Sequence, residues 1–197
     1  MKITLLDDEF KKKIRIYDSG DSYIPGHTNR IFKIKIIENK PNLFVSGGWD
    51  STLFLWDIRT PKSVNSIFGP CISGDAIDVK ENMVLTGSYR DKECLELFDI
   101  RNFTKICTIQ QEAYQNHLNY ISCCKFGRGK DTNNKIIASS CITNLVNIFQ
   151  KDLIYKKEID ISGSKSSIYS CGFYNNLNRF FLATAEGKFQ VFDFTEF

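Results

Sequence analysis

Short stretches in which apolar and polar residues alternate follow one another along the whole chain. Residues 31–36 alternate Ile, Lys and Lys with Phe, Ile and Ile, and residues 52–57 alternate Thr, Phe and Trp with Leu, Leu and Asp. A period of two is typical of β-strands, and apolar residues at helical spacing are missing almost everywhere. The pattern predicts an all-β protein with strands near residues 3–6, 14–17, 31–36, 43–46, 53–57, 63–68, 76–79, 83–89, 95–99, 120–126, 135–140, 145–150, 167–174, 179–184 and 187–194.

The strands form a repeat, because an aromatic residue closes one strand in each group. These aromatic residues lie at positions 17, 56, 98, 149 and 192, and their spacings are 39, 42, 51 and 43 residues. Near-constant spacing predicts five copies of one unit, with one insertion that we place in residues 127–134. The closing pairs are Tyr17-Asp18, Trp56-Asp57, Phe98-Asp99, Phe149-Gln150 and Phe192-Asp193.

The unit is most complete in residues 26–57. It begins with Gly26-His27, continues through a strand and a hairpin turn that contains Gly47-Gly48, and ends at Trp56-Asp57. A Gly-His pair, strands and a closing Trp-Asp within about 40–45 residues make up the signature of a WD40 propeller blade. The chain therefore resembles the WD40-repeat β-propeller family, closely around residues 26–59 and more distantly elsewhere.

The resemblance implies one all-β domain over residues 1–197, a WD40-type β-propeller of about four to five blades. We expect a partial blade at 1–25, blades at 26–68, 69–110 and 111–160, and a blade lacking its last strand at 161–197. Family members usually close with seven blades, so we expect an incomplete or open arc of a seven-bladed ring. Three explanations stay open: a piece of a longer protein, which we favour, self-association through open propeller edges, or closure as a five-bladed ring.

The resemblance also implies a buried structural tetrad at His27, Ser46, Asp50 and Trp56. In such a tetrad the carboxylate accepts from the imidazole, the imidazole engages the hydroxyl, and the hydroxyl accepts from the indole, so every buried polar group has a partner. The composition is that of a Ser-His-Asp triad, but a buried and fully paired Ser is structural. We therefore predict no catalytic residue.

The other repeats depart from this tetrad. In the next repeat Thr86 matches Ser46, while Phe98 replaces the Trp and removes the indole donor. In the following repeat Ser139 is matched to Ser46, and His117 is a weak match to His27. These blades are expected to depend on packing.

Composition excludes several function classes. The net charge of 197 residues is only +3, which gives no strong attraction to nucleic acid or anionic membrane. Seven Cys without a CxxC pair and only two His make a metal site improbable and favour reduced thiols in the cytoplasm or nucleus. No apolar stretch approaches the roughly 20 residues that span a bilayer, and we expect no signal peptide. We expect no cofactor, no metal and no enzymatic activity.

The leading functional hypothesis is a protein-interaction scaffold. In the family, the residue before the turn Asp often contacts ligands from the upper rim, which implies partner-binding roles for Trp49 and Tyr89, joined by Arg30 and Arg90. A second hypothesis uses Arg59 and Arg101, because Trp56-Asp57-Ile58-Arg59 and Phe98-Asp99-Ile100-Arg101 look like the WDxR box of cullin–RING ligase substrate receptors. A third is RNA binding, which would use Lys11–Lys13 and Arg30.

Overall fold

A computed structural model describes residues 1–9, 11–18, 26–108, 120–151, 155–161, 167–174 and 179–193. This part of the chain contains seventeen β-strands and no helix. The prediction of an all-β protein is confirmed.

The strands form five antiparallel sheets, each built from strands that follow one another in sequence. The first sheet contains β1 (Ile3–Leu6) and β2 (Lys13–Tyr17). The second contains β3 (Ile31–Ile37), β4 (Lys40–Gly48), β5 (Thr52–Asp57) and β6 (Ser63–Phe68). The third contains β7 (Ile77–Lys80), β8 (Met83–Gly87), β9 (Leu95–Asp99) and β10 (Thr104–Thr108).

The remaining sheets follow the same order. The fourth contains β11 (Ile121–Phe126), β12 (Lys135–Ser140), β13 (Leu145–Gln150) and β14 (Tyr155–Asp160). The fifth contains β15 (Ile168–Phe173), β16 (Arg179–Thr184) and β17 (Phe189–Asp193).

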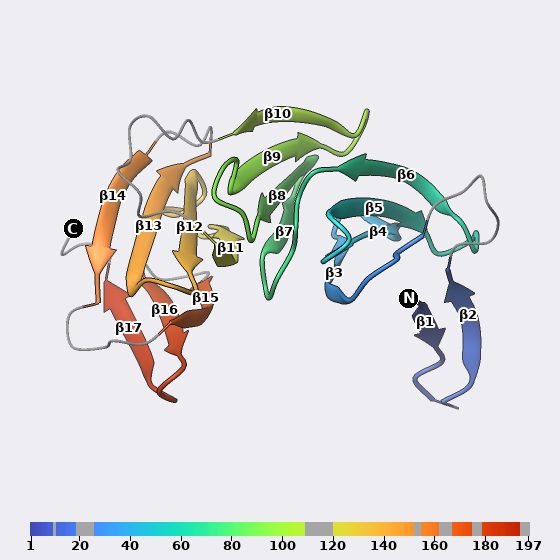
Figure 1. Ribbon diagram of the computed structural model, residues 1–197, viewed down its shortest axis with the longest axis horizontal. Helices are drawn as coiled ribbons and strands as arrows, with labels where there is room; N and C mark the ends of the chain where they lie inside the picture. The colour runs from blue at the N-terminus through green and yellow to red at the C-terminus, as the bar shows by residue number, and fades with distance from the viewer. Residues whose placement is uncertain are drawn as a thin grey trace.

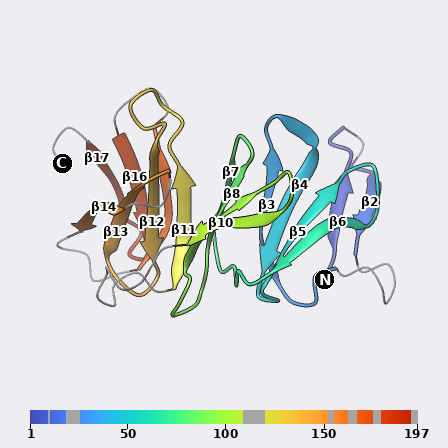
Figure 2. The ribbon, with the colours of Figure 1, turned by 90° about the horizontal axis from the view of Figure 1, so that it is seen from above.

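The sheets are arranged as the blades of a propeller. Figure 1 shows them fanned into an arc, with β1–β2 at one end and β15–β17 at the other, and Figure 2 shows the blades standing side by side. The first strand of each complete blade lies innermost, and these strands pack in series, β3 against β7, β7 against β11 and β11 against β15. The fold is therefore a β-propeller with four blades, from the second sheet to the fifth, preceded by the two-stranded first sheet.

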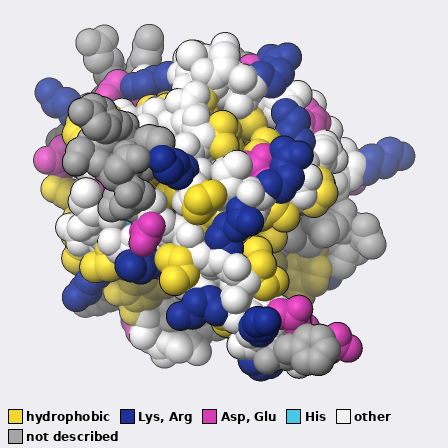
Figure 3. Space-filling model, turned by 90° about the vertical axis from the view of Figure 1, so that its right-hand side faces the viewer, with side chains coloured by type: hydrophobic (Ala, Val, Ile, Leu, Met, Phe, Trp, Pro, Cys, Tyr) yellow, Lys and Arg dark blue, Asp and Glu magenta, His cyan; other side chains and the backbone are white. Residues whose placement is uncertain are grey.

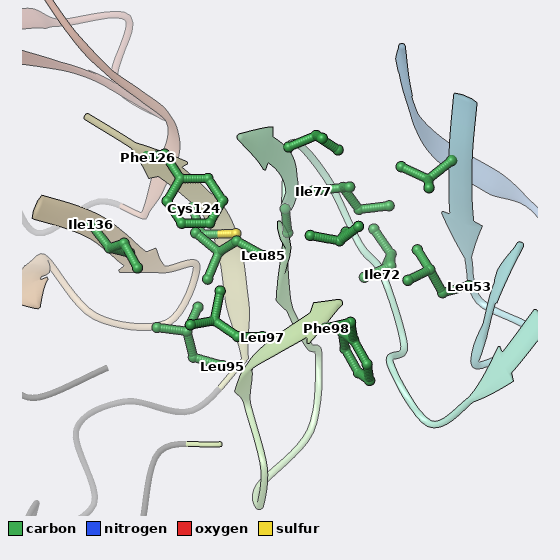
Figure 4. Packing of buried hydrophobic residues seen from close by; sticks show 14 of the residues in the cluster. Leu53, Ile72, Ile77, Leu85, Leu95, Leu97, Phe98, Cys124, Phe126 and Ile136 are labelled. Atoms are coloured by element: carbon green, nitrogen blue, oxygen red, sulfur yellow. The ribbon is translucent and has the colours of Figure 1, made fainter. Parts of the chain in front are cut away.

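The hydrophobic core lies between the blades, because alternate residues of each strand point to opposite faces of its sheet. Figure 4 shows the largest cluster, which joins the second, third and fourth sheets. A separate cluster joins the fourth and fifth sheets, and a third joins the first and second. The labelled side chains of the largest cluster are Leu53, Ile72, Ile77, Leu85, Leu95, Leu97, Phe98, Cys124, Phe126 and Ile136.

Charged side chains link the inner strands across two of these junctions. Asp75 contacts Lys33 on one side and, at 2.7 Å, Lys125 on the other. Asp78 is fully buried, and its carboxylate lies 3.0 Å from Nζ of Lys35 and 2.8 Å from Nη1 of Arg128. Burial raises the pKa of Asp78, but the hydrogen bonds and charge of Arg128, with the charge of Lys35, outweigh it and leave the pKa below its usual value.

The insertion expected in residues 127–134 accounts for only part of the longer repeat. Residues 127–134 do connect β11 to β12, where only residues 38–39 and 81–82 connect the corresponding strands of the two preceding blades. The rest of the extra length lies between β10 and β11, in a segment that includes residues 109–119, which are outside the described part of the chain.

Candidate protein-interaction site

Four polar side chains meet inside the second sheet, beneath one rim of the propeller. Nε1 of Trp56 donates to Oγ of Ser46 at 2.7 Å, and Oγ of Ser46 lies 2.6 Å from Nε2 of His27. Nδ1 of His27 lies 2.7 Å from Oδ2 of Asp50. The structure therefore brings together all four residues of the expected tetrad, and the chain of hydrogen bonds crosses β5 and β4 to reach the segment before β3.

The tetrad sets the electrostatics of the turn between β4 and β5. Burial raises the pKa of Asp50, but the hydrogen bond and charge of His27, together with the amide of Thr28, bring it below its ordinary value. Oδ2 of Asp50 accepts from the Thr28 amide at 3.0 Å as well as contacting His27. Asp50 therefore stays ionised and fixes residues 27 and 28 to the hairpin turn.

A close backbone approach places Arg30 beside Trp49. The amide of Trp49 donates to the carbonyl of Arg30 at 3.0 Å. A Cβ added to Gly48 would lie only 1.9 Å from that carbonyl oxygen, so the strands can approach here only because residue 48 is glycine. The turn then continues through Ser51, which has a positive φ of 54°.

This close approach brings three exposed side chains together at the surface. They are Arg30, Phe32 and Trp49, which we call the rim cluster. The guanidinium carbon of Arg30 lies 5.5 Å from the centre of the Trp49 ring, within cation–π range. The Phe32 and Trp49 rings lie 5.0 Å apart. Trp49 is nevertheless 43% exposed. A surface hollow of about 350 Å³ borders the other two residues of the cluster and is lined by Met1, Lys2, Arg30, Ile31 and Phe32.

The two expected partner-binding residues of the third sheet, Tyr89 and Arg90, differ in their surroundings. Tyr89 is 42% exposed and stacks on Tyr120 of the next blade, with ring centres 4.7 Å apart. Arg90 instead turns inward and pairs with the buried carboxylate of Glu96 at 2.7 Å. Tyr89 therefore extends the aromatic rim, whereas the guanidinium of Arg90 neutralises the Glu96 carboxylate inside the blade.

The third sheet lacks the tetrad, as its sequence indicates. Thr86 is fully buried, and its Oγ1 has no hydrogen-bond partner among the residues described. Phe98 is buried at the position of Trp56 and packs in the core.

In the fourth sheet the expected match of Ser139 to Ser46 is wrong by one residue. Ser46 pairs with Phe54, which lies two residues before Trp56. In the fourth sheet the residue two positions before Phe149 is Asn147, and it pairs with Ala138. Ser139 therefore takes the place of Gly47 on the opposite face of its strand. His117 lies outside the described residues.

Arg59 and Arg101 lie where strands β5 and β9 end. Arg59 contacts its own Asp57 through Nη2 at 2.6 Å and Nε at 2.9 Å, and Arg101 repeats this contact with Asp99 at 2.6 Å and 3.1 Å. The side-chain and backbone hydrogen bonds from Arg59 lower the pKa of Asp57 to about 2, and Arg101 does the same for Asp99. Both arginines remain exposed, but each already has a carboxylate partner.

The other expected features have these positions. Lys11 lies in the connection between β1 and β2 and contacts Asp8 at 3.2 Å. None of the seven cysteines forms a disulfide. Across the described ranges no group of three or more His, Cys, Asp or Glu side chains is arranged to hold a metal ion, and none of those ranges forms a helix long and apolar enough to cross a membrane.

Comparison with protein families assigns the central repeat. The family model described as "WD domain, G-beta repeat" matches residues 21–57, the segment that contains the rim cluster and the tetrad. The matched segment is similar to one WD40 repeat. The third and fourth sheets repeat the four-stranded architecture of the second sheet with different sequences.

Curated relatives of the chain include a G-protein beta subunit and a WD repeat-containing protein. The guanine nucleotide-binding protein subunit beta of Nicotiana plumbaginifolia is 37% identical over 102 residues, which are 50% of this chain and 25% of that protein. WD repeat-containing protein 82 of Drosophila melanogaster is 32% identical over 85 residues, 42% of this chain and 25% of that protein. The chain spans about a quarter of the length of these relatives.

Solved structures show the same fold. The computationally designed Ika8 protein superposes with a TM-score of 0.68 over 98% of this chain and 52% of the designed chain, at 19% identity. The designed Ika4 protein superposes with a TM-score of 0.64 over 86% of this chain and 94% of its own length, at 18% identity.

Sequence reasoning missed two features near the site. Phe32 was assigned only to an inner strand, although its alternation with Lys33 places the two side chains on opposite faces. Asp78 lies between the apolar Ile77 and Val79, and a charged residue inside an apolar strand was the available signal for the buried ion pairs.

Proposed function

We propose that this chain is a non-enzymatic protein-interaction scaffold that binds its partner through the rim cluster of Arg30, Phe32 and Trp49. The observation that carries the proposal is the exposed Trp49 ring held between Arg30 and Phe32. Trp and Arg are enriched among residues that dominate binding energy. The tetrad lies directly below and fixes the turn, so little ordering entropy opposes binding.

The relatives support an interaction role over catalysis. They include G-protein beta subunits and WD-repeat proteins, and the match covers the repeat that presents the rim cluster. The Ser46 hydroxyl is fully buried and already bonded to Trp56, so it is unsuited to nucleophilic attack on a substrate. We place the protein in the cytoplasm or nucleus, where cysteines such as its seven stay reduced.

The proposal is tested by a photo-crosslinking amino acid introduced at position 29 of the full chain in its native cells, because Asn29 is exposed and adjoins Arg30 without belonging to the rim cluster. Discrete protein adducts are expected at position 29 and not at position 64. Val64 is the matched control, because it is 56% exposed but lies on β6, the outermost strand of the same blade. Equal adducts at both positions, or adducts to nucleic acid alone, would overturn the proposal.

The ligase alternative rests on Arg59 and Arg101. Their substitution by Ala should abolish co-purification of a cullin–RING adaptor if that reading is correct. Adaptor recovery unchanged by these substitutions would rule the alternative out. The RNA alternative predicts retention on RNA that decreases with salt, because phosphate binding releases counterions.

A further inference from the structure

The inner strands of the propeller form a stack in which β3 and β15 are the two end strands among those described, and each packs against an inner strand on one side. β7 packs between β3 and β11, and β11 packs between β7 and β15. β3 packs against β7 with one face, through Lys33 and Lys35. Its opposite face points toward the first sheet.

This opposite face of β3 is apolar and largely open. Ile34 pairs directly with Ser46, and Ile36 pairs with Phe44, so these side chains share one face of the second sheet. Ser46 and Phe44 are buried, but Ile34 is 44% exposed and Ile36 is 60% exposed. With Phe32 they form an apolar stripe at every second residue, which we call the β3 stripe.

The stripe is open because the first sheet covers only the outer part of this face. The Tyr17 ring packs 5.2 Å from Phe44 and 5.9 Å from Trp56, over β4 and β5. Within the described strands β1 pairs only with β2, so its other edge has unpaired backbone groups. In Figure 1, β1 is the strand of this sheet nearer the centre of the arc.

The beginning of β1 is fixed beside the beginning of β3. The amino group of Met1 donates to the carbonyl of His27 at 2.7 Å, and Met1 and Lys2 line one hollow with Arg30, Ile31 and Phe32. The open edge of β1 and the β3 stripe therefore border the same space.

We infer that this space is a docking site for one extended strand of a partner polypeptide, which pairs with the edge of β1 and covers the β3 stripe. The strand carries apolar residues at alternate positions. Strand addition of this kind takes its affinity from backbone hydrogen bonds and its specificity from alternate side chains.

Charge selects an apolar strand. The closed face of β3 presents Lys33 and Lys35 to the acidic residues Asp75 and Asp78. The stripe presents only Phe32, Ile34 and Ile36, so a charged side chain opposite them would lose water without gaining a partner.

The geometry also favours one strand over a whole blade. β4 and β5 are already covered, since Phe44, Phe54 and Trp56 are buried against Ile3 and Tyr17. Figure 3 views this end of the molecule and shows hydrophobic surface interspersed with Lys and Arg side chains rather than one continuous apolar face.

The test measures binding of a labelled peptide to the full chain by fluorescence polarisation. The probe has seven residues, the length of β3, with Val alternating with Thr and Lys added at both ends for solubility. We expect saturable binding to the monomer, weakened at least about tenfold by Ile34→Lys with Ile36→Lys, because burial of each Ile is lost. N-methylation of alternate peptide amides should weaken binding to a similar degree, because it removes hydrogen bonds to β1.

The matched control is Val64→Lys with Ile106→Lys, which changes two exposed residues on the outermost strands β6 and β10. It should leave peptide binding unchanged, and near-ultraviolet circular dichroism of Trp56 should report the same fold in both double variants. Absence of saturable binding, equal binding to both variants, or equal binding of the N-methylated peptide would overturn the proposal. Light scattering that shows a dimer dissociated by the Ile34 and Ile36 substitutions would also overturn it, by assigning the stripe to a second copy.

Discussion

The indole nitrogen of Trp56 donates a 2.7 Å hydrogen bond to the Ser46 hydroxyl, and both residues are buried beneath the rim cluster. This bond links the third strand of the second sheet to its second strand. His27 extends it to the turn that presents Trp49. The rigidity of the exposed Trp49 is therefore set by a buried polar contact.

Removal of the Ser46 hydroxyl should destabilise the protein. In Ser46→Ala, Nε1 of Trp56 and Nε2 of His27 both lose a partner in a buried environment, which should cost about 2–3 kcal/mol of unfolding free energy. Urea unfolding followed by Trp fluorescence measures the change. The matched variant is Thr86→Val in the third sheet, where the hydroxyl has no partner among the described residues.

Thr86→Val should be neutral or stabilising, within about 1 kcal/mol, because a buried unpaired hydroxyl is replaced by a methyl group. Equal destabilisation by the two variants would show that the hydrogen bonds of Ser46 contribute nothing beyond packing.

Loss of the Arg90 guanidinium should be costly although the residue lies near the surface. Arg90→Ala leaves Glu96 buried with only Lys105, at 2.8 Å, as an ionic partner. We expect the free energy of unfolding, measured with urea, to fall by about 2–4 kcal/mol, because removal of one partner of a buried ion pair leaves the other charge incompletely compensated. Arg101→Ala is the control, because its carboxylate partner Asp99 lies at the surface, and it should change stability little.

Acid should destabilise the propeller through its paired carboxylates. The folded pKa values of Asp50 and Asp78 lie below the usual value of 3.8, so the unfolded state binds more protons as the pH falls. Their contribution is present above about pH 4 and is lost as the pH falls through the folded pKa values. Urea unfolding as a function of pH measures this slope.

Asp50→Asn should reduce the dependence of the unfolding free energy on pH, because the amide does not titrate. It should also lower stability at neutral pH, because a neutral amide replaces the carboxylate that contacts His27. A slope unchanged by Asp50→Asn would mean that other carboxylates account for the acid sensitivity.

Much of the fold was predictable from local pattern. Alternation placed every described strand except β10 and β14. The aromatic residues that close β5, β9, β13 and β17 gave the blade period, because each blade must bury its third strand. The second sheet was the easiest case, since each residue of its tetrad is polar at a position that must be buried.

The contacts between blades were not predictable in the same way. Arg90 was expected on the rim, but its partner Glu96 lies six residues further on in β9, and only the folded hairpin shows that the carboxylate is buried. The choice of Ser139 in place of Ala138 failed because one residue of register reverses the face of a strand. The exposure of the β3 stripe depends on which strands lie beside β3 in space, and the local sequence pattern does not predict those neighbours.

The rim cluster is the surface through which we propose that the chain holds its partner. Quantitative co-purification from the native cells should compare the wild-type chain with Trp49→Ala, Arg30→Ala and the control Val64→Ala. We predict that the same proteins are recovered with wild type and Val64→Ala, and that their recovery falls at least about tenfold with Trp49→Ala, as expected for a binding hot spot. Recovery unchanged by both rim substitutions, with folding intact, would contradict the account.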